Sequence, residues 1–117
     1  MDLPELNEGE IYAGLILDAE GKPQHHLVLL PGDTGDLSWK MAKAFAETAG
    51  GELPTRQEQA LLFANCKKHL KPAWYWSSTQ HASGSSYAWC QDFHYGDQDY
   101  TNAGIKLRAR AVRRSAI

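Results

Sequence analysis

The chain has 117 residues, of which 43% are hydrophobic and 22% are charged, and its formal net charge is −2. This size and balance fit one domain over residues 1–117, with a core over roughly residues 10–114, and they exclude the composition of a disordered segment. The charge is uneven, because residues 106–117 hold five cations and no acid while the rest holds seven cations and fourteen acids. We therefore expect the basic C-terminal segment to pair with internal acids or to face an anionic partner.

The N-terminal residues MDLPELNEGE are acidic and lack the basic start and apolar stretch of a signal peptide. No apolar run in the sequence reaches membrane-spanning length. These features predict a product made in the cytoplasm without a signal peptide, and no membrane partner. The two cysteines, Cys66 and Cys90, have neither metal-site spacing nor the number needed for a disulfide framework, so reduced structural thiols are the preferred interpretation.

The first part of the chain predicts a hairpin followed by two helices. Aliphatic residues in IYAGLILD and HHLVLLPG flank the turn-like AEGKPQ, which is the pattern of two strands. Apolar residues recur at helical spacing over residues 38–49, with Ser38 as the N-cap and Gly50 as the stop. A second helix is indicated by the capping box of Thr55 and Glu58, and Pro72 prevents its continuation.

Beyond the second helix, the spacing of apolar residues becomes that of strands. In YAWCQDFHY, aromatic residues alternate with smaller or polar ones. We expect Trp89 and Phe93 to point into the core, and Cys90, Asp92 and His94 to point outward. The order of elements, with no internal repeat and no linker, predicts one α+β domain.

The segment IKLRARAVRR predicts a further alternating strand, with Lys106, Arg108 and Arg110 on one face. An exposed row of these cations, continued by Arg114, could hold sulfate, phosphate or nucleic acid. On a central strand the same cations would pair with internal acids. We favour this structural role, because the rest of the chain is acidic.

The order of these elements, together with IYAGLI, LPTRQEQALLFAN, WYWSST, AWCQDF and LRARAVRR, resembles the Lcl C-terminal-domain family, especially its short phage-associated and prophage-encoded members. The resemblance spans nearly the whole chain. It implies a C-type-lectin-like fold with an N-terminal β-hairpin, neighbouring termini, two helices beside a small twisted antiparallel sheet, and an irregular region that carries binding. Family relatives act as adhesion or ligand-binding modules, some for sulfated polysaccharides, and related lectin-like proteins recognise host receptors for phages. Some are targets of diversity-generating retroelements.

The C-terminal hairpin is the expected binding surface. Tyr provides contact area at little entropy cost, and small polar side chains supply adaptable hydrogen bonds, which is the composition that adaptable paratopes use. A solvated hairpin with polar tips is the alternative, and tryptophans in this region are expected in the core. The predicted binding residues are Gln80, His81, Tyr87, Cys90, Asp92, His94, Tyr95, Asp97, Asp99, Tyr100 and Asn102.

We expect no catalytic residue, metal site or cofactor. The histidines lack H-E-x-x-H spacing, no G-x-S-x-G elbow surrounds the serines, and the EPN and WND motifs of calcium-dependent sugar-binding lectins are absent. The expected function is a non-enzymatic ligand-binding or adhesion module of phage or prophage origin, with virion association as one location. Its expected ligand is a surface protein or glycan, and other phage tail proteins or further copies of the chain are additional candidate partners.

Two other classes of function stay open. An enzyme similar to the formylglycine-generating oxidases would use a cysteine pair, for which Cys66 and Cys90 are the candidates. An intracellular interaction protein, including a nucleic-acid binder, would use the basic C-terminal strand, and the overall acidity disfavours this reading.

Overall fold

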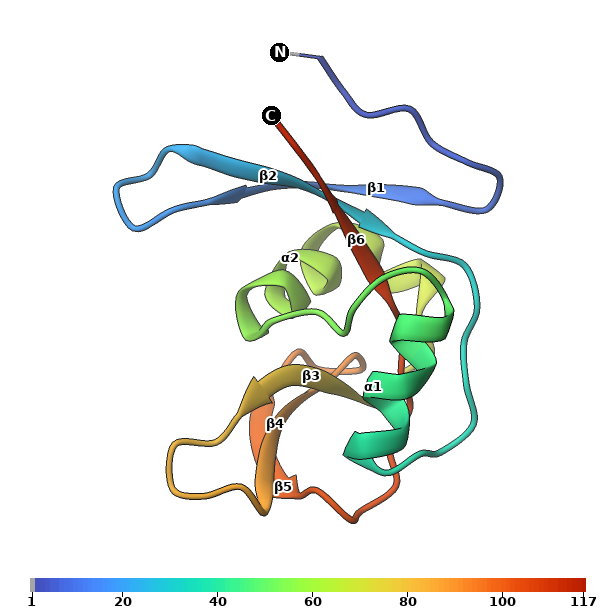
Figure 1. Ribbon diagram of the computed structural model, residues 1–117, viewed down its shortest axis with the longest axis vertical. Coiled ribbons are helices and arrows are strands. Elements are labelled where there is room, and N and C mark those ends of the chain that lie inside the picture. The colour runs from blue at the N-terminus through green and yellow to red at the C-terminus, as the bar shows by residue number, and fades with distance from the viewer. Residues whose placement is uncertain (1) are drawn as a thin grey trace.

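The computed structural model describes residues 2–117 as an α+β fold with two helices and two small antiparallel sheets (Figure 1). This agrees with the fold class expected from the order of elements. The elements are β1 (Ile11–Leu17), β2 (Pro23–Leu29), α1 (Trp39–Thr48), α2 (Arg56–Cys66), the short 3-10 helix η1 (Lys67–His69), β3 (Trp74–Gln80), β4 (Tyr87–Asp92), β5 (Gln98–Asn102) and β6 (Val112–Ser115).

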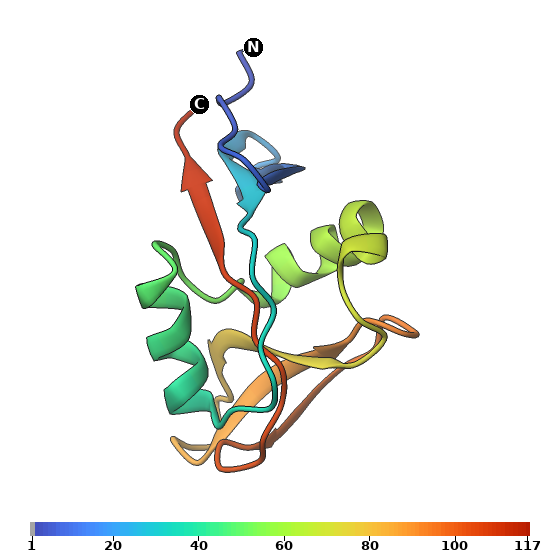
Figure 2. The same ribbon diagram turned by 90° about the vertical axis from the view of Figure 1, so that its right-hand side faces the viewer.

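The first sheet joins the two ends of the chain. Its strand order is β1-β2-β6, and both pairings are antiparallel. The predicted N-terminal hairpin is therefore confirmed, and the C-terminal strand β6 lies beside its second strand, with Val28 opposite Arg113. Both termini consequently lie at the same end of the molecule (Figures 1 and 2).

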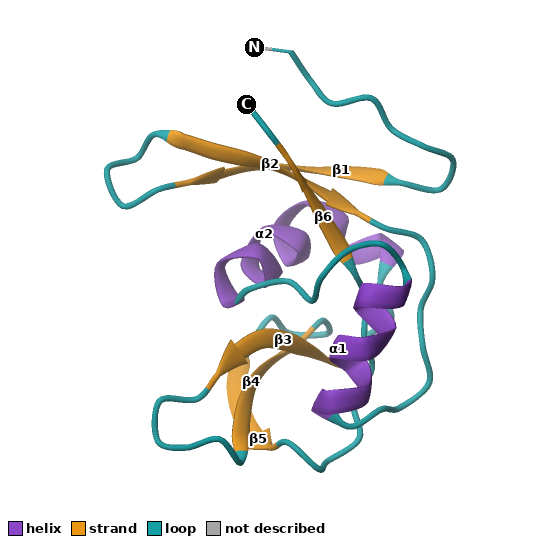
Figure 3. Ribbon diagram, viewed as in Figure 1, coloured by secondary structure: helices purple, strands orange, loops and turns teal. Residues whose placement is uncertain are grey.

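The second sheet has the order β3-β4-β5 and lies at the end of the molecule away from the termini (Figure 3). Trp89 of β4 pairs with Tyr100 of β5. The loop over residues 81–86 joins β3 to β4, and a turn over residues 93–97 joins β4 to β5. These two connections leave opposite ends of β4, at the lower left and the right of Figure 2.

Both helices begin where the local sequence predicts. The Ser38 hydroxyl accepts a hydrogen bond from the backbone of α1, and Gly50 follows the helix with φ +89°. In α2 the capping box is complete, because the Thr55 hydroxyl accepts from the Glu58 backbone N–H at 3.1 Å and the Glu58 carboxylate accepts from the Thr55 N–H at 2.9 Å. These contacts satisfy backbone donors that a helix start leaves unpaired.

Two groups of buried side chains form the core. One lies between the first sheet, α2 and β3, and includes Leu27, Leu62, Tyr75 and Phe93. The other surrounds the fully buried Trp76 and includes side chains of α1, β4 and the segment before β6. The burial of Phe93 confirms the prediction for this residue.

The predicted faces of β4 were wrong. Cys90 and Asp92 are buried, with 3% and 8% of their surface exposed, whereas Trp89 is partly exposed on the opposite face. The buried face of β4 lies in the core group that contains the large side chains of Trp39 and Trp76. This strand contributes the small side chains of Ala88 and Cys90 to that group. Alternation defines two faces of a strand, but it does not say which one enters the core.

The predicted C-terminal strand is also shorter than expected. β6 covers Val112–Ser115, and the residues before it form isolated bridges at Leu107 and Arg108. Residues 109–111 are buried and lie between the two sheets, because the Ala111 carbonyl accepts from Leu30 N and the Arg108 carbonyl accepts from Trp76 N. A segment bonded on both sides has no solvent face, so the exposed row of alternate cations, which was the less favoured alternative, does not form.

The basic segment pairs with internal acids, as the favoured interpretation predicted. Arg113 donates to both carboxylate oxygens of Glu10, at 3.0 and 2.8 Å. The hydrogen bonds from Arg113 lower the pKa of Glu10 to about 2. Arg108 pairs with Asp33 at 3.2 Å. Buried Arg110 instead donates to two backbone carbonyl oxygens.

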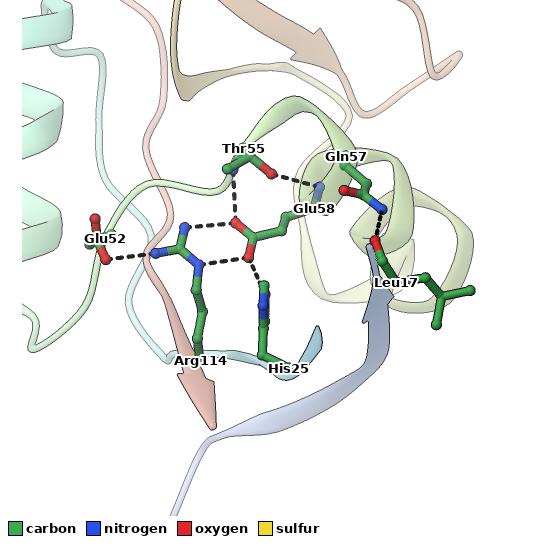
Figure 4. Close-up of polar contacts among 7 residues, drawn as sticks. All are labelled: Leu17, His25, Glu52, Thr55, Gln57, Glu58 and Arg114. Carbon is green, nitrogen blue, oxygen red and sulfur yellow. Dashed lines mark hydrogen bonds and ion pairs between the residues drawn. The ribbon is translucent and has the colours of Figure 1, made fainter. Parts of the chain in front are cut away.

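Arg114 belongs to a polar network that joins β2, α2 and β6 (Figure 4). Its guanidinium donates to both oxygens of Glu58, which is only 1% exposed. His25 lies 2.8 Å from the same carboxylate, and Arg114 also contacts Glu52 at 2.6 Å. Burial raises the pKa of Glu58, but the hydrogen bonds from Arg114, the Thr55 backbone and His25 outweigh it, so the pKa is lowered.

Candidate functional site

The candidate site lies on the face of β4 and β5 that points away from Trp76. Cross-strand partners in an antiparallel sheet share a face, so the pairing of Trp89 with Tyr100 places both side chains together. Tyr87, two residues before Trp89, points to the same side. His81, from the loop between β3 and β4, joins them through its ring. We call these residues, His81, Tyr87, Trp89 and Tyr100, the aromatic face.

The rings of the aromatic face contact one another directly. The His81 and Tyr100 centroids are 3.8 Å apart with an interplanar angle of 30°. Trp89 lies 5.3 Å from His81 and 5.5 Å from Tyr100, while Tyr87 meets Tyr100 edge to face at 6.1 Å. Aromatic pairs at such distances contribute about 0.5–1.5 kcal/mol beyond area burial. The rings therefore hold each other in position before any ligand arrives.

The aromatic face is open to solvent. Tyr87 and Tyr100 are 39% and 45% exposed, and His81 and Trp89 are partly exposed. Large aromatic side chains that cluster on the surface are more informative than single exposed ones. Their rigid rings offer contact area with little entropy loss on binding.

A hydrogen bond fixes the orientation of His81. Its Nδ1 accepts from the Ser83 backbone N–H at 3.1 Å and lies 2.7 Å from the Ser83 hydroxyl. Because Nδ1 is the acceptor, the proton of the neutral ring lies on Nε2. The ring is thus held over Tyr100, and its Nε2 makes no hydrogen bond with the described residues 2–117.

Arg56, the first residue of α2, borders the aromatic face. Its guanidinium carbon lies 3.5 Å from the centroid of the Trp89 ring, in cation–π geometry. Its Nε donates to Gln98 Oε1 at 2.9 Å, and Gln98 Nε2 donates to the Arg56 carbonyl at 2.7 Å and to Gln91 Oε1 at 2.8 Å. These contacts attach the start of α2 to β4 and β5.

A cavity of about 350 Å³ lies next to Arg56. It lies between α2 and the strands β4 and β5, and its lining includes Gln91, Gln98 and Phe63. The guanidinium borders both this cavity and Trp89. A ligand on the aromatic face can therefore extend toward α2.

The structure brings together only part of the predicted binding residues. His81, Tyr87 and Tyr100 form the aromatic face, and Asn102 pairs with Tyr87 across the sheet. Exposed Gln80 ends β3, just before the loop that carries His81. The Asn102 side chain accepts from Gly104 N at 2.8 Å and so also shapes the turn after β5.

A second group of predicted residues lies at the other end of β4. His94, Tyr95 and Asp97 are exposed in the turn after β4, where the His94 and Tyr95 rings are 4.0 Å apart. They do not join the aromatic face, because β4 separates them (Figure 2). Asp92 does not point outward as predicted: its buried carboxylate accepts from the backbone N–H groups of His94 and Tyr95 and supports the turn.

Cys90 does not point outward as predicted either. Its thiol is buried and donates to the Asp99 carbonyl at 3.4 Å. Burial and the nearby Asp99 carboxylate raise the pKa of Cys90 to about 12. Burial also raises the pKa of Cys66, which belongs to the other core group. Exposed Asp99 borders a second cavity of about 240 Å³, which is also lined by Trp74, Cys90 and Tyr100.

Sequence reasoning missed two residues of the site. Trp89 was expected in the core, because aromatic residues of small domains usually lie there. Arg56 is separated from Trp89 by more than thirty positions, and its place in a capped helix start gave no functional signal. Tyr87, which stands two positions before Trp89 and so shares its face, was the available sign that this face of β4 is open.

Residues 2–117 form neither a cluster of metal ligands nor a membrane-spanning helix. Over these residues, no group of three or more histidine, cysteine, aspartate or glutamate side chains is arranged to hold a metal ion. The helices described there are too short or too polar to cross a membrane.

Comparisons with known proteins place the chain in no family. No protein-family model matches the sequence, and no curated protein shows a significant match.

Proposed function

We propose that the protein is a non-enzymatic ligand-binding module that recognises a surface protein or glycan through the aromatic face. The observation that carries this proposal is the solvent-open stack of His81, Tyr100 and Trp89 with Arg56 beside it. Pre-positioned aromatic and arginine side chains are typical anchors of binding surfaces. The face needs no metal or cofactor to present these groups.

The arrangement of the chain ends supports display of this face. Both termini lie beside the first sheet, whereas β4 and β5 lie at the other end of the molecule (Figure 1). A neighbouring protein attached at the termini would leave the aromatic face free. This geometry also suits the C-type-lectin-like fold that we propose, with the N-terminal hairpin and β6 at the base.

A phage or prophage origin, with attachment to a virion and to other tail proteins, is the biological setting we propose. The resemblance to the Lcl C-terminal-domain family supports this setting, and variation by a diversity-generating retroelement belongs to the same proposal. The nucleic-acid alternative loses support, because Arg108, Arg113 and Arg114 are engaged with carboxylates of the fold. The oxidase alternative loses support, because its two candidate thiols are buried in separate core groups.

The proposal is tested with arrays of bacterial surface proteins and glycans, probed with the wild-type protein and two variants. The double variant Tyr87→Ala/Tyr100→Ala removes the exposed rings of the aromatic face and should lose binding. Tyr95→Ala is the matched control, because Tyr95 is 73% exposed but lies in the turn at the other end of β4. Loss of binding by Tyr95→Ala with full binding by the double variant would place the site at the turn instead.

A further inference from the structure

Arg56 differs from the other arginines in how its charge is compensated. Within residues 2–117, carboxylate partners are present for Arg108, Arg113 and Arg114. Buried Arg110 donates to two backbone carbonyl oxygens. No ion pair to a carboxylate forms at Arg56 within this described range, and its Nε donates to the neutral side chain of Gln98. A positive charge that no carboxylate within residues 2–117 pairs with thus lies beside the aromatic face.

The orientation of this charge is fixed. Stacking on Trp89 at 3.5 Å sets the plane of the guanidinium, and the hydrogen bond to Gln98 holds its Nε. The terminal nitrogens make no hydrogen bond with residues 2–117 and stay free to donate. A planar guanidinium with two free nitrogens matches the geometry of a carboxylate and forms paired, charge-assisted hydrogen bonds with it.

The stacking of the aromatic face favours a protein segment over a sugar as its partner. A sugar ring that stacks on a protein needs an aromatic ring with an open face. Here His81 covers one face of Tyr100 at 3.8 Å, and Arg56 covers one face of Trp89 at 3.5 Å. Tyr87 meets Tyr100 edge to face at 6.1 Å, and beside these rings the site presents tyrosine hydroxyls and a guanidinium. Tyr, Trp and Arg are the residues most enriched at the energetic centres of protein interfaces.

We propose that the aromatic face binds a protein segment whose Asp or Glu side chain pairs with the Arg56 guanidinium. This inference rests on the proposed function of the aromatic face and adds the chemistry of its partner. The carboxylate accepts from the free nitrogens of Arg56, while Tyr87 and Tyr100 contact the residues on either side of it. Charge complementarity at this point selects acidic segments over neutral ones.

The experiment selects short random peptides, displayed on yeast, for binding to the folded wild-type protein. Selected peptides are synthesised in two forms, one with the original Asp or Glu and one with Asn or Gln in its place. We expect acidic residues to be enriched, and both the amide peptide and the Arg56→Gln variant to weaken binding by about tenfold to a hundredfold. Combining the two changes should add little further loss, because both remove the same contact.

Two further variants separate the pairing from general effects of charge. Arg56→Lys keeps the positive charge but loses the planar fork, so it should bind the acidic peptides more weakly than wild type and more tightly than Arg56→Gln. Lys43→Gln is the matched control, because Lys43 lies 3.7 Å over the ring of Trp39 on α1, away from the aromatic face. It should leave peptide binding unchanged, and thermal melts should show that all variants stay folded.

Each contrary result overturns a defined part of the proposal. Peptides that bind wild type and Arg56→Gln equally, but lose binding on Tyr100→Ala, would overturn the carboxylate pairing and leave the proposed function intact. Tyr100-dependent binding of uronic-acid or neutral oligosaccharides, without any bound peptide, would overturn the protein partner but not the binding face. If Tyr100→Ala changes the binding of neither peptides nor oligosaccharides, the proposed function itself is wrong.

Discussion

Arg114 and Glu58 form a bidentate ion pair between β6 and α2, with Nε–Oε2 at 2.7 Å and Nη2–Oε1 at 2.8 Å. The pair attaches the C-terminal strand to the helix that carries Arg56. Glu58 is also the second member of the capping box. Its carboxylate therefore accepts hydrogen bonds from both the Thr55 backbone N–H and the Arg114 guanidinium. The contact thus links β6 to the start of α2, where Arg56 lies beside Trp89.

We expect Arg114→Leu to destabilise the protein by about 3 kcal/mol, because it leaves the Glu58 carboxylate buried without its main partner. Urea denaturation at pH 7 measures the loss. Glu52→Gln is the matched control: Glu52 is 70% exposed in its contact with Arg114, so the expected change is about 0.5 kcal/mol or less. A loss in Arg114→Leu as small as that of the control would show that the pair contributes little to stability.

We expect stability to fall as the pH falls from about 5 toward 2, the range over which carboxyl groups with depressed pKa values become protonated. Hydrogen bonds from Arg113, and next from the Asn7 backbone, lower the pKa of Glu10 to about 2, and the pKa of Glu58 is also lowered. A carboxyl group with a depressed pKa stabilises the folded state above its ordinary pKa and loses this contribution on protonation. In Arg113→Gln the acid-induced decrease should be smaller than in wild type, as urea midpoints at pH 7 and pH 3 will show. Equal decreases in both proteins would show that Glu10 does not contribute to the loss of stability in acid.

The corrected faces of β4 predict different costs for two tryptophans. Trp76 is fully buried, so Trp76→Ala should cost about 3–5 kcal/mol. Trp89→Ala loses the contacts with Arg56 and Tyr100 on an open surface, and should cost on the order of 1–2 kcal/mol. Thermal melts of the two variants decide: if Trp89→Ala unfolds the protein as readily as Trp76→Ala, this face of β4 is part of the core.

The cysteines should react slowly in the folded protein. Reaction requires the thiolate, and burial raises the pKa of Cys90 to about 12 and also raises that of Cys66. At pH 8 we expect little labelling by a thiol-reactive disulfide reagent in buffer, and labelling of both cysteines in denaturant. Rapid labelling of Cys90 without denaturant would support an exposed, reactive thiol and reopen the oxidase alternative.

The parts of the fold that depend on neighbouring residues could be predicted from the sequence. The capping box of Thr55 and Glu58, the helix stop at Gly50 and the N-terminal hairpin all involve contacts between residues close along the chain. Such contacts follow from backbone geometry and side-chain chemistry over a few positions. The pairing of the basic segment with acids was predictable as well, because an acidic chain with cations gathered at one end offers many internal partners.

Only the tertiary structure decided which residues form the candidate site. The alternation along β4 defines two faces, but the side chains of α1 and β3 determine that Cys90 lies inside and Trp89 outside. Arg56 reaches Trp89 because α2 packs across β4 and β5, a contact that depends on the whole fold. His81 joins Tyr100 in the same way, because the pairing of β4 with β5 brings the loop after β3 beside β5.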